Sequence, residues 1–131
     1  MNDRFKFRVW DKQSNSYTKE KKFYIDEFGG LFKYEKSKST VYINSDNPYI
    51  MCLCSDRYIC EQCTGLKDKN GKLIYEGDIV KFENEISEVK WCINGFAIDD
   101  GIQYLVDDMD IEVIGNVHEN KELLNEIFNG N

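Results

Sequence analysis

The chain has 131 residues, of which 41% are apolar and 14% aromatic, and its net charge is −7. A chain of this length can bury one ordinary core or two small cores that share an interface, so its stability requires neither a metal nor a disulfide. No apolar run approaches the ~18 residues of a membrane span, and the N-terminus lacks an apolar signal core. We therefore expect a soluble cytoplasmic protein that does not contact a membrane.

Charge is divided unevenly along the chain. Residues 1–40 carry 10 Lys and Arg against 6 Asp and Glu, a net charge of +4, and the remaining residues carry 7 against 18, a net charge of −11. Either the two parts attract each other, within one protomer or between protomers of a homo-oligomer, or they form two differently charged solvated faces, which is the favoured interpretation. The overall negative charge argues against general binding to nucleic acid, because phosphate contacts need a basic surface.

The first half of the chain is patterned as short strands. Residues 4–10 alternate apolar and basic side chains, as in a half-buried strand, with Trp10 on the basic side. Residues 23–32 are broken by Gly29 and Gly30, and they predict a pair of strands around these glycines in preference to a short helix that ends there. Residues 33–40 predict a polar loop. Further strands are predicted from Tyr17 onward and at 41–43, 49–54 and 58–63.

The stretch 62–82 is the densest in turn chemistry. Asn70 and Gly71 lie between two apolar runs and predict a two-residue hairpin turn, because this pair readily takes positive φ angles. Residues 76–78, Glu-Gly-Asp, predict a second reversal. A short strand at 73–75 separates the two turns, and the next strand begins directly after the second.

The C-terminal part continues this pattern and ends in the only expected helix. It contains strands at 88–93, 96–98 and 111–117, with turns at Asn94-Gly95 and Asp100-Gly101. Strands at this density indicate small barrels or a sandwich. The helix is expected at about 121–128 with Asn120 as its N-cap. Its apolar face is formed by Leu123, Leu124, Ile127 and Phe128.

Three blocks of the sequence carry a family resemblance. They are KFRVWD at 6–11, TGLKDKNGK with IYEGDIV at 64–72 and 74–80, and VIGNVHEN with ELL at 113–120 and 122–124. Their order and spacing resemble the YopX family of small phage and prophage proteins. The sequence departs from the family pattern at Cys63 and Lys121, and residues 17–50 match nothing specific.

The resemblance implies a mostly β fold built of small SH3-like barrel units with one short C-terminal helix. We accordingly expect a single domain over residues 1–131. It would have an N-terminal β part at about 1–57, an SH3-like barrel half at about 58–120 and the helix at about 121–128. The resemblance also implies a phage or prophage protein that acts in the cytoplasm of a bacterial host.

Four cysteines fall close together and raise the question of a zinc site. Cys52, Cys54, Cys60 and Cys63 have the spacing C-x-C-x5-C-x2-C. Zinc usually takes its thiolates from two C-x2-C turns, and only the last two cysteines have that spacing. Zinc is therefore the minor alternative, and buried free thiols in a reducing cytoplasm are favoured. A redox role is weaker still, because no predicted helix N-terminus would activate a thiol. We expect no cofactor.

The other residues that could carry chemistry have plainer interpretations. His118 is the only histidine and no nucleophile motif accompanies it, so we expect a structural role. An acidic region lacks the glycine of a calcium-binding loop, so we expect it to be a solvated face. Acid-base catalysis or metal-dependent catalysis by Asp108 and Asp110 is the minor alternative. The region consists of Asp99, Asp100, Asp107, Asp108, Asp110 and Glu112.

Four aromatic residues could form a peptide-binding face, although aromatics at strand spacing are more often core. They are Trp10, Tyr75, Trp91 and Phe96. An acid-rich surface beside such aromatics would favour a basic partner.

Taken together, these patterns predict a non-enzymatic protein-interaction module. The alternative is a nucleic-acid-binding protein that uses the basic N-terminal strand region. Its phosphate contacts would be Arg4, Lys6, Arg8, Lys19, Lys21 and Lys22. An enzyme of unrecognised type is the third hypothesis.

Overall fold

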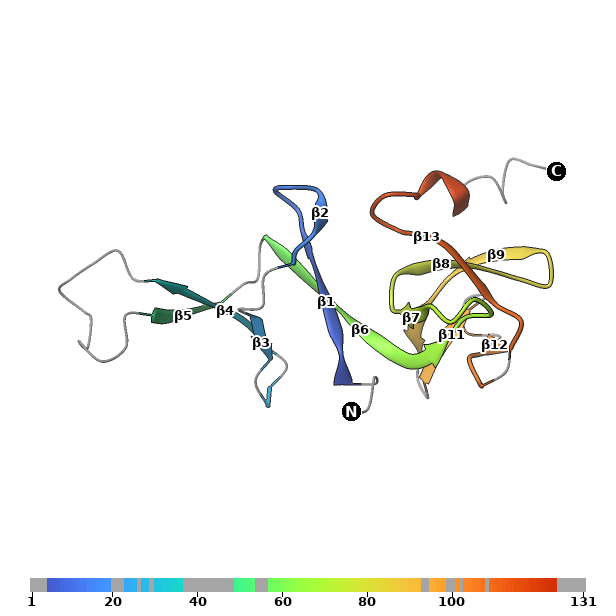
Figure 1. Ribbon diagram of the computed structural model, residues 1–131, viewed down its shortest axis with the longest axis horizontal. Helices are drawn as coiled ribbons and strands as arrows, with labels where there is room; N and C mark the ends of the chain where they lie inside the picture. The colour runs from blue at the N-terminus through green and yellow to red at the C-terminus, as the bar shows by residue number, and fades with distance from the viewer. Residues whose placement is uncertain are drawn as a thin grey trace. The chain divides into compact units, whose positions relative to one another are not determined.

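The computed structural model describes residues 5–19, 23–25, 27–28, 30–36, 49–53, 57–92, 95–98, 101, 103–107 and 109–124. These residues form 13 β-strands in four sheets and a helical turn at 122–124 (Figure 1). The predicted fold class is confirmed: several small antiparallel sheets that include a half-barrel, and one short C-terminal helix. No helix among the described residues combines the length and hydropathy that a membrane span requires.

The chain forms two compact units. The smaller unit comprises residues 9–60, and the larger unit comprises residues 1–8 together with 61–131. Two strands, β1 (Phe7–Asp11) and β6 (Tyr58–Lys67), contribute residues to both units, in a sheet of order β2-β1-β6-β7. The start of the chain thus belongs with the C-terminal half of the sequence.

The smaller unit consists of short antiparallel strands. β1 pairs with β2 (Ser16–Tyr17). A separate sheet has the order β3-β4-β5 and is formed by β3 (Phe23–Ile25), β4 (Leu31–Lys36) and β5 (Tyr49–Leu53). Residue 25 pairs with residue 31, which confirms the strand pair predicted around the two glycines.

One prediction for this unit is wrong. Residues 33–36, predicted as part of a polar loop, continue β4 because they pair with residues 49–52 of β5. Pairing with a neighbouring strand outweighs the weak β propensity of Lys and Glu side chains. The strand predicted at 41–43 lies outside the described residues.

Two side-chain pairs connect the end of β1 to other residues of the smaller unit. The ring of Trp10 is buried and meets the ring of Tyr17 edge-on, with 4.9 Å between centroids. Arg57 donates to both carboxylate oxygens of Asp11, at 2.9 Å each. These hydrogen bonds from Arg57 hold the pKa of Asp11 well below its usual range.

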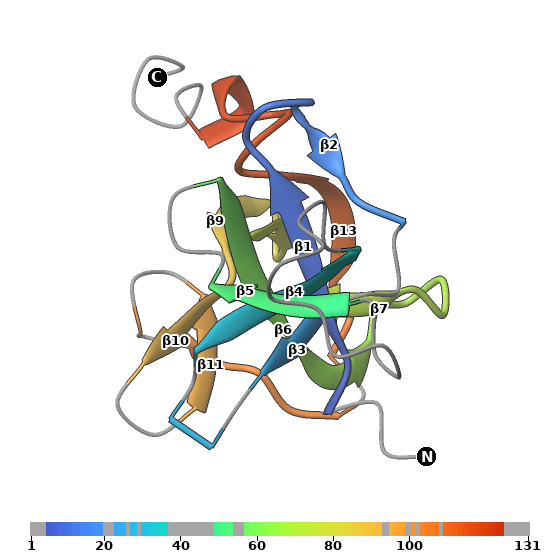
Figure 2. The ribbon, with the colours of Figure 1, turned by 90° about the vertical axis from the view of Figure 1, so that its left-hand side faces the viewer.

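The larger unit is built from consecutive hairpins around one core. Its remaining strands are β7 (Leu73–Tyr75), β8 (Asp78–Phe82), β9 (Glu85–Glu88), β10 (Lys90–Cys92), β11 (Gly95–Ile98), β12 (Gln103–Tyr104) and β13 (Glu112–Asn116). They form sheets of order β13-β8-β9 and β10-β11-β12, and Figure 2 shows β10 beside β11. The core consists of Ile74, Val80, Val89, Ile98 and Ile111, each at most 3% exposed.

Glycine permits the first turn of this unit, but the turn differs from the prediction. Gly71 has a φ angle of +84°, as the predicted hairpin requires. Asp68 N–H donates to the Lys72 carbonyl, and Gly71 N–H donates to the Asp68 carbonyl. The loop therefore spans residues 68–72 instead of two residues, and the Asp68 side chain organises it.

A two-residue turn of the larger unit lies where the sequence carries no Asn-Gly signal. Glu83 and Asn84 both have positive φ angles, 51° and 67°, and they connect Phe82 to its paired residue Glu85. Two positive φ angles match the right-handed twist of a hairpin, so strand pairing imposes them on residues that rarely adopt them. Gly95, predicted as a turn residue, already pairs with Cys92 as the first residue of β11.

The predicted cap of the C-terminal helix is also wrong. Leu123 N–H donates to the backbone carbonyl of Asn120, so the helical turn begins there. The Asn120 side chain, however, accepts the N–H of Asn116 at 3.1 Å, because the chain folds back over Gly115 and brings the amide against β13. Ile127 and Phe128 lie outside the described residues.

Candidate functional site

The three sequence blocks meet at a group of charged side chains in the larger unit. We call Arg8, Glu61, Asp78 and His118 the charged cluster. Arg8 Nη2 lies 2.8 Å from Asp78 Oδ1, and Arg8 Nε lies 3.1 Å from Glu61 Oε1. His118 Nε2 lies 3.3 Å from Glu61 Oε2. One guanidinium and one carboxylate thus connect segments that are far apart in the sequence.

Both carboxylates of the charged cluster are buried and bonded on both oxygens. Asp78 is 1% exposed, and its Oδ2 accepts the N–H of Tyr75 at 2.8 Å. Burial raises the pKa of Asp78, an effect that Arg8 and the Tyr75 N–H offset only in part. Glu61 is 4% exposed and is shared between Arg8 and His118. Carboxylates saturated in this way act as anchors between segments.

Gly77 allows the Glu-Gly-Asp turn to lie directly against Glu61. Its φ angle is +87°, and a Cβ at this position would collide with the Glu61 carboxylate. The Gly77 N–H donates to the Val89 carbonyl, and the Gly77 carbonyl accepts the N–H of Val117, both at 2.9 Å. The turn therefore joins β6, residue 89 and the C-terminal block at a single point.

The C-terminal block places His118 on Glu61. Asn116 Oδ1 accepts the backbone N–H groups of both His118 and Glu119, at 3.0 Å each. This side-chain-to-backbone turn holds residues 116–119 in a tight bend. The bend directs the His118 imidazole onto the carboxylate of Glu61, which supports a structural role for this histidine.

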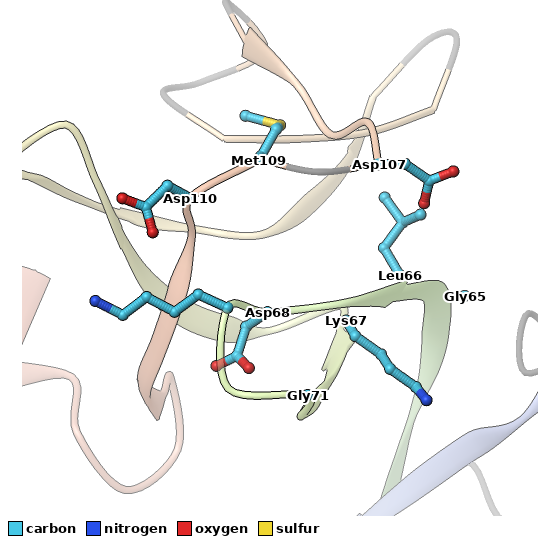
Figure 3. A pocket seen from close by; sticks show the side chains of 9 residues that line it. Gly65, Leu66, Lys67, Asp68, Gly71, Asp107, Met109 and Asp110 are labelled. Atoms are coloured by element: carbon cyan, nitrogen blue, oxygen red, sulfur yellow. The ribbon is translucent and has the colours of Figure 1, made fainter.

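The larger unit also carries an open groove of about 660 Å³ (Figure 3). It lies between the end of β6 with the following turn on one side and Asp107, Met109 and Asp110 on the other. Leu66 and Met109 contribute apolar side chains, and Asp107 and Asp110 contribute exposed carboxylates. Figure 3 shows Leu66 projecting toward Asp107, whereas Lys67 points to the opposite side of the strand.

Asp68 closes the bottom of this groove and links the hairpin to β13. Its Oδ1 accepts the N–H groups of Asn70 and Lys72, at 2.9 Å each, and its Oδ2 accepts the N–H of Val113 at 3.0 Å. Burial by itself would raise the pKa of Asp68, but the three backbone donors outweigh burial and hold the pKa below its usual value.

We expect Asp68→Asn to lower the free energy of unfolding by about 2 kcal/mol at neutral pH, because one oxygen that accepts a backbone N–H is lost. Since the pKa of Asp68 is lowered by folding, its contribution is present above pH ~3.9 and is lost as the pH falls through the folded pKa. Urea unfolding at pH 7 and pH 3 should therefore show a smaller difference between the two proteins at pH 3.

Asp110→Asn is the matched control for this prediction. It removes an exposed charge from the same groove and should change stability by less than about 0.5 kcal/mol. Equal losses in the two variants would show that the Asp68 hydrogen bonds contribute little.

The predicted aromatic face is only partly assembled. The rings of Trp91 and Phe96 meet edge-on at 4.9 Å in the β10-β11-β12 sheet, and Trp91 is 59% exposed. Trp10 is instead buried in the smaller unit. Tyr75 lies beneath the Arg8 guanidinium, whose Cζ is 4.8 Å from the centroid of the Tyr75 ring. The exposed surface that remains is the Trp91–Phe96 pair.

The structure describes only part of the cysteine group. Cys63 is fully buried and Cys60 is partly buried, and both are free thiols. The side chain of Cys52 and the whole of Cys54 lie outside the described residues. Within the part of the chain that is described, no group of three or more His, Cys, Asp or Glu side chains could hold a metal ion. The zinc site stays an untested alternative.

The basic and acidic candidates are scattered. Arg8 points into the charged cluster, and Lys6 and Lys19 are exposed. Glu112 pairs with Lys69 at 3.4 Å. The other candidates lie outside the described residues, and they are Arg4, Lys21, Lys22, Asp99, Asp100 and Asp108.

Sequence reasoning missed the roles of Arg8, Glu61 and Asp78. The alternating pattern placed Arg8 on the solvated side of a strand, and the Glu-Gly-Asp motif identified Asp78 as a turn residue. Their burial depends on pairing across 53 residues for Arg8 with Glu61 and 70 residues for Arg8 with Asp78, which no local pattern reports. The one available signal is that Arg8 and Asp78 both lie in blocks that carry the family resemblance.

Comparison with known proteins finds a matching family and similar solved structures. A family model described as YopX protein matches residues 6–125. The crystal structure of protein EF1440 from Enterococcus faecalis is similar, with 26% identity, a TM-score of 0.59, and coverage of 91% of this chain and 96% of that chain.

A second similar structure is the X-ray crystal structure of protein yopX from Bacillus subtilis. It has 22% identity and a TM-score of 0.53, and the alignment covers 89% of this chain and 95% of that chain. At this identity the likeness shows the fold alone. A search of curated proteins finds no match.

Proposed function

The chain belongs to the YopX family, and from this premise we propose that it is a non-enzymatic protein-interaction module of a phage or prophage. The observation that carries the proposal is the exposure of Trp91, 59% of which is open to solvent although its ring rests on Phe96. Tryptophan held by a neighbouring ring and left exposed is the residue type most enriched at the centre of protein interfaces.

The charged cluster supports a non-enzymatic function. A general base needs a carboxylate or imidazole that can reach a substrate proton. Both oxygens of Asp78 and of Glu61 already accept protein hydrogen bonds, and His118 is directed at Glu61. The cluster is therefore better suited to hold the larger unit together than to exchange protons with a ligand.

The nucleic-acid alternative is weakened by the position of Arg8. This side chain, proposed as a phosphate contact, bonds Glu61 and Asp78 inside the larger unit. The net charge of −7 would also repel a polyanion.

We propose that the protein acts in the cytoplasm of the bacterial host, where it can also self-associate.

The test is a pull-down of the tagged protein from host lysate, with and without nuclease, read by quantitative mass spectrometry. We expect a stoichiometric protein partner that survives nuclease, and Trp91→Ala should lower its recovery about 30-fold at limiting concentration, corresponding to the ~2 kcal/mol of an interface hot spot. Phe28→Ala is the matched control, because Phe28 is 88% exposed in the smaller unit.

Circular dichroism and thermal unfolding should confirm that both variants fold. Recovery that is lost on nuclease treatment would shift the assignment to nucleic acid. Equal recovery of the partner with Trp91→Ala and with the wild type would show that Trp91 does not contribute to the interface.

A further inference from the structure

The groove in Figure 3 is lined by two apolar side chains and two exposed carboxylates. Leu66 and Met109 line it from opposite sides and are themselves packed against the core, so both are firmly held. Asp107 and Asp110 flank Met109 on the opposite wall. Among the described residues, neither carboxylate makes a hydrogen bond or an ion pair. The groove therefore offers negative charge beside hydrocarbon.

The lysines near the groove do not neutralise this charge. Lys69 is paired with Glu112, with 3.4 Å between Nζ and Oε2. Lys67 leaves the strand on the side opposite Leu66, and its ammonium points away from Asp107 and Asp110 (Figure 3). Among the described residues, the carboxylates of Asp107 and Asp110 thus face solvent without a compensating cation from the neighbouring strand.

The surrounding sequence strengthens the negative field at this wall. Residues 91–120 contain seven Asp and Glu and no Lys or Arg. Clusters of one sign raise the local concentration of opposite charge and speed the association of a cationic partner. An anionic ligand would be repelled from the same surface.

We propose that this groove binds a lysine or arginine side chain from a basic, extended segment of the partner protein. The inference rests on the proposed function and names the chemistry of the partner. Lys and Arg lay a long aliphatic stem along apolar surface and keep the charged head beside an acid, which matches Leu66 projecting toward Asp107 (Figure 3). The volume of about 660 Å³ has room for several residues of such a segment.

The experiment uses purified full-length protein and a capped hexa-arginine peptide, followed by backbone amide resonances in NMR titrations at physiological salt. The expected shifts concentrate at residues 65–71 and 107–110. Asp107→Asn combined with Asp110→Asn should weaken binding at least 10-fold. Glu83→Gln combined with Glu85→Gln is the matched control, because it removes the same charge from exposed residues of the β8–β9 hairpin, and it should weaken binding less than 2-fold.

Equal weakening by the two double variants would overturn the proposal, since binding would then follow net charge alone. Shifts spread over all acidic residues would do the same, and a capped hexaglutamate peptide should produce none. The titration uses no host partner, so its failure is separate from a failure of the pull-down. If the pull-down finds a partner that depends on Trp91 but hexa-arginine does not bind the groove, the proposed interaction function would be supported and the groove would not be a binding site.

Discussion

Gly77→Ala is expected to lower the free energy of unfolding by about 2 to 6 kcal/mol. A non-glycine residue held at positive φ costs about 1 to 3 kcal/mol, and forcing an extra methyl group into a packed site costs about 1 to 3 kcal/mol more. Both penalties apply, because the φ angle is +87° and the new Cβ would meet the buried Glu61 carboxylate. The loss is a large fraction of the total stability of a domain of this size.

Gly71→Ala is the matched control. Gly71 has nearly the same φ angle, +84°, but nothing lies within 4 Å of the Cβ position. It should therefore lose only the backbone penalty, about 1 to 3 kcal/mol. Urea unfolding of both variants, followed by tryptophan fluorescence, separates the collision with Glu61 from the cost of the φ angle. Equal losses would mean that Glu61 moves aside without penalty.

A double-mutant cycle identifies Glu61 as the cause. Glu61→Ala removes the carboxylate that the alanine at position 77 would meet, so the double variant should be more stable than the sum of the single losses predicts. We expect a coupling free energy of about 1 to 3 kcal/mol, the range for residues in contact. Additive losses would contradict the steric explanation.

Arg8→Ala is expected to destabilise the larger unit by about 3 to 5 kcal/mol at neutral pH. The change leaves Asp78, which is 1% exposed, with a buried charge and no counter-ion. Breaking a buried ion pair by removing one partner has this cost because the remaining charge cannot be solvated. Lys69→Ala is the matched control, since the Lys69–Glu112 pair is 46% and 40% exposed and should contribute less than about 1 kcal/mol.

The loss should depend on pH in a defined direction. Burial raises the pKa of Asp78 in the folded protein, and without Arg8 the pKa should rise further. A group whose pKa is raised by folding contributes stability below its unfolded pKa and loses that contribution as the pH rises through the folded pKa. The difference between Arg8→Ala and the wild type should therefore be smaller at pH 4 than at pH 7.

A second variant tests the same cause. Arg8→Ala combined with Asp78→Asn leaves no buried charge at residue 78, and the amide oxygen still accepts the Tyr75 N–H. It should recover part of the stability lost in Arg8→Ala. A penalty that is independent of pH and is not recovered would indicate that Arg8 acts through packing on Tyr75, whose ring its guanidinium covers.

Most of the strands and the family could be predicted from the sequence, because both are local signals. Alternation of apolar residues identified β1, short apolar runs beside the turns identified β7 and β8, and glycine at Gly71 and Gly77 identified two turns that require positive φ. Where the strand ladder imposes a conformation, local reasoning failed. The Glu83-Asn84 turn and the continuation of β4 through residues 33–36 both follow from pairing, which the residues themselves do not encode.

The candidate sites divide in the same way. The sequence determined a mostly β, acidic YopX protein with its turn residues and an expected preference for basic partners. Only the tertiary structure decided that Arg8 is an internal counter-ion, that Trp91 and not Trp10 is exposed, and that Asp107 and Asp110 share a groove with Leu66. Burial and ion pairing depend on which distant strands meet, and pairs separated by 53 to 70 residues leave no trace in a local pattern.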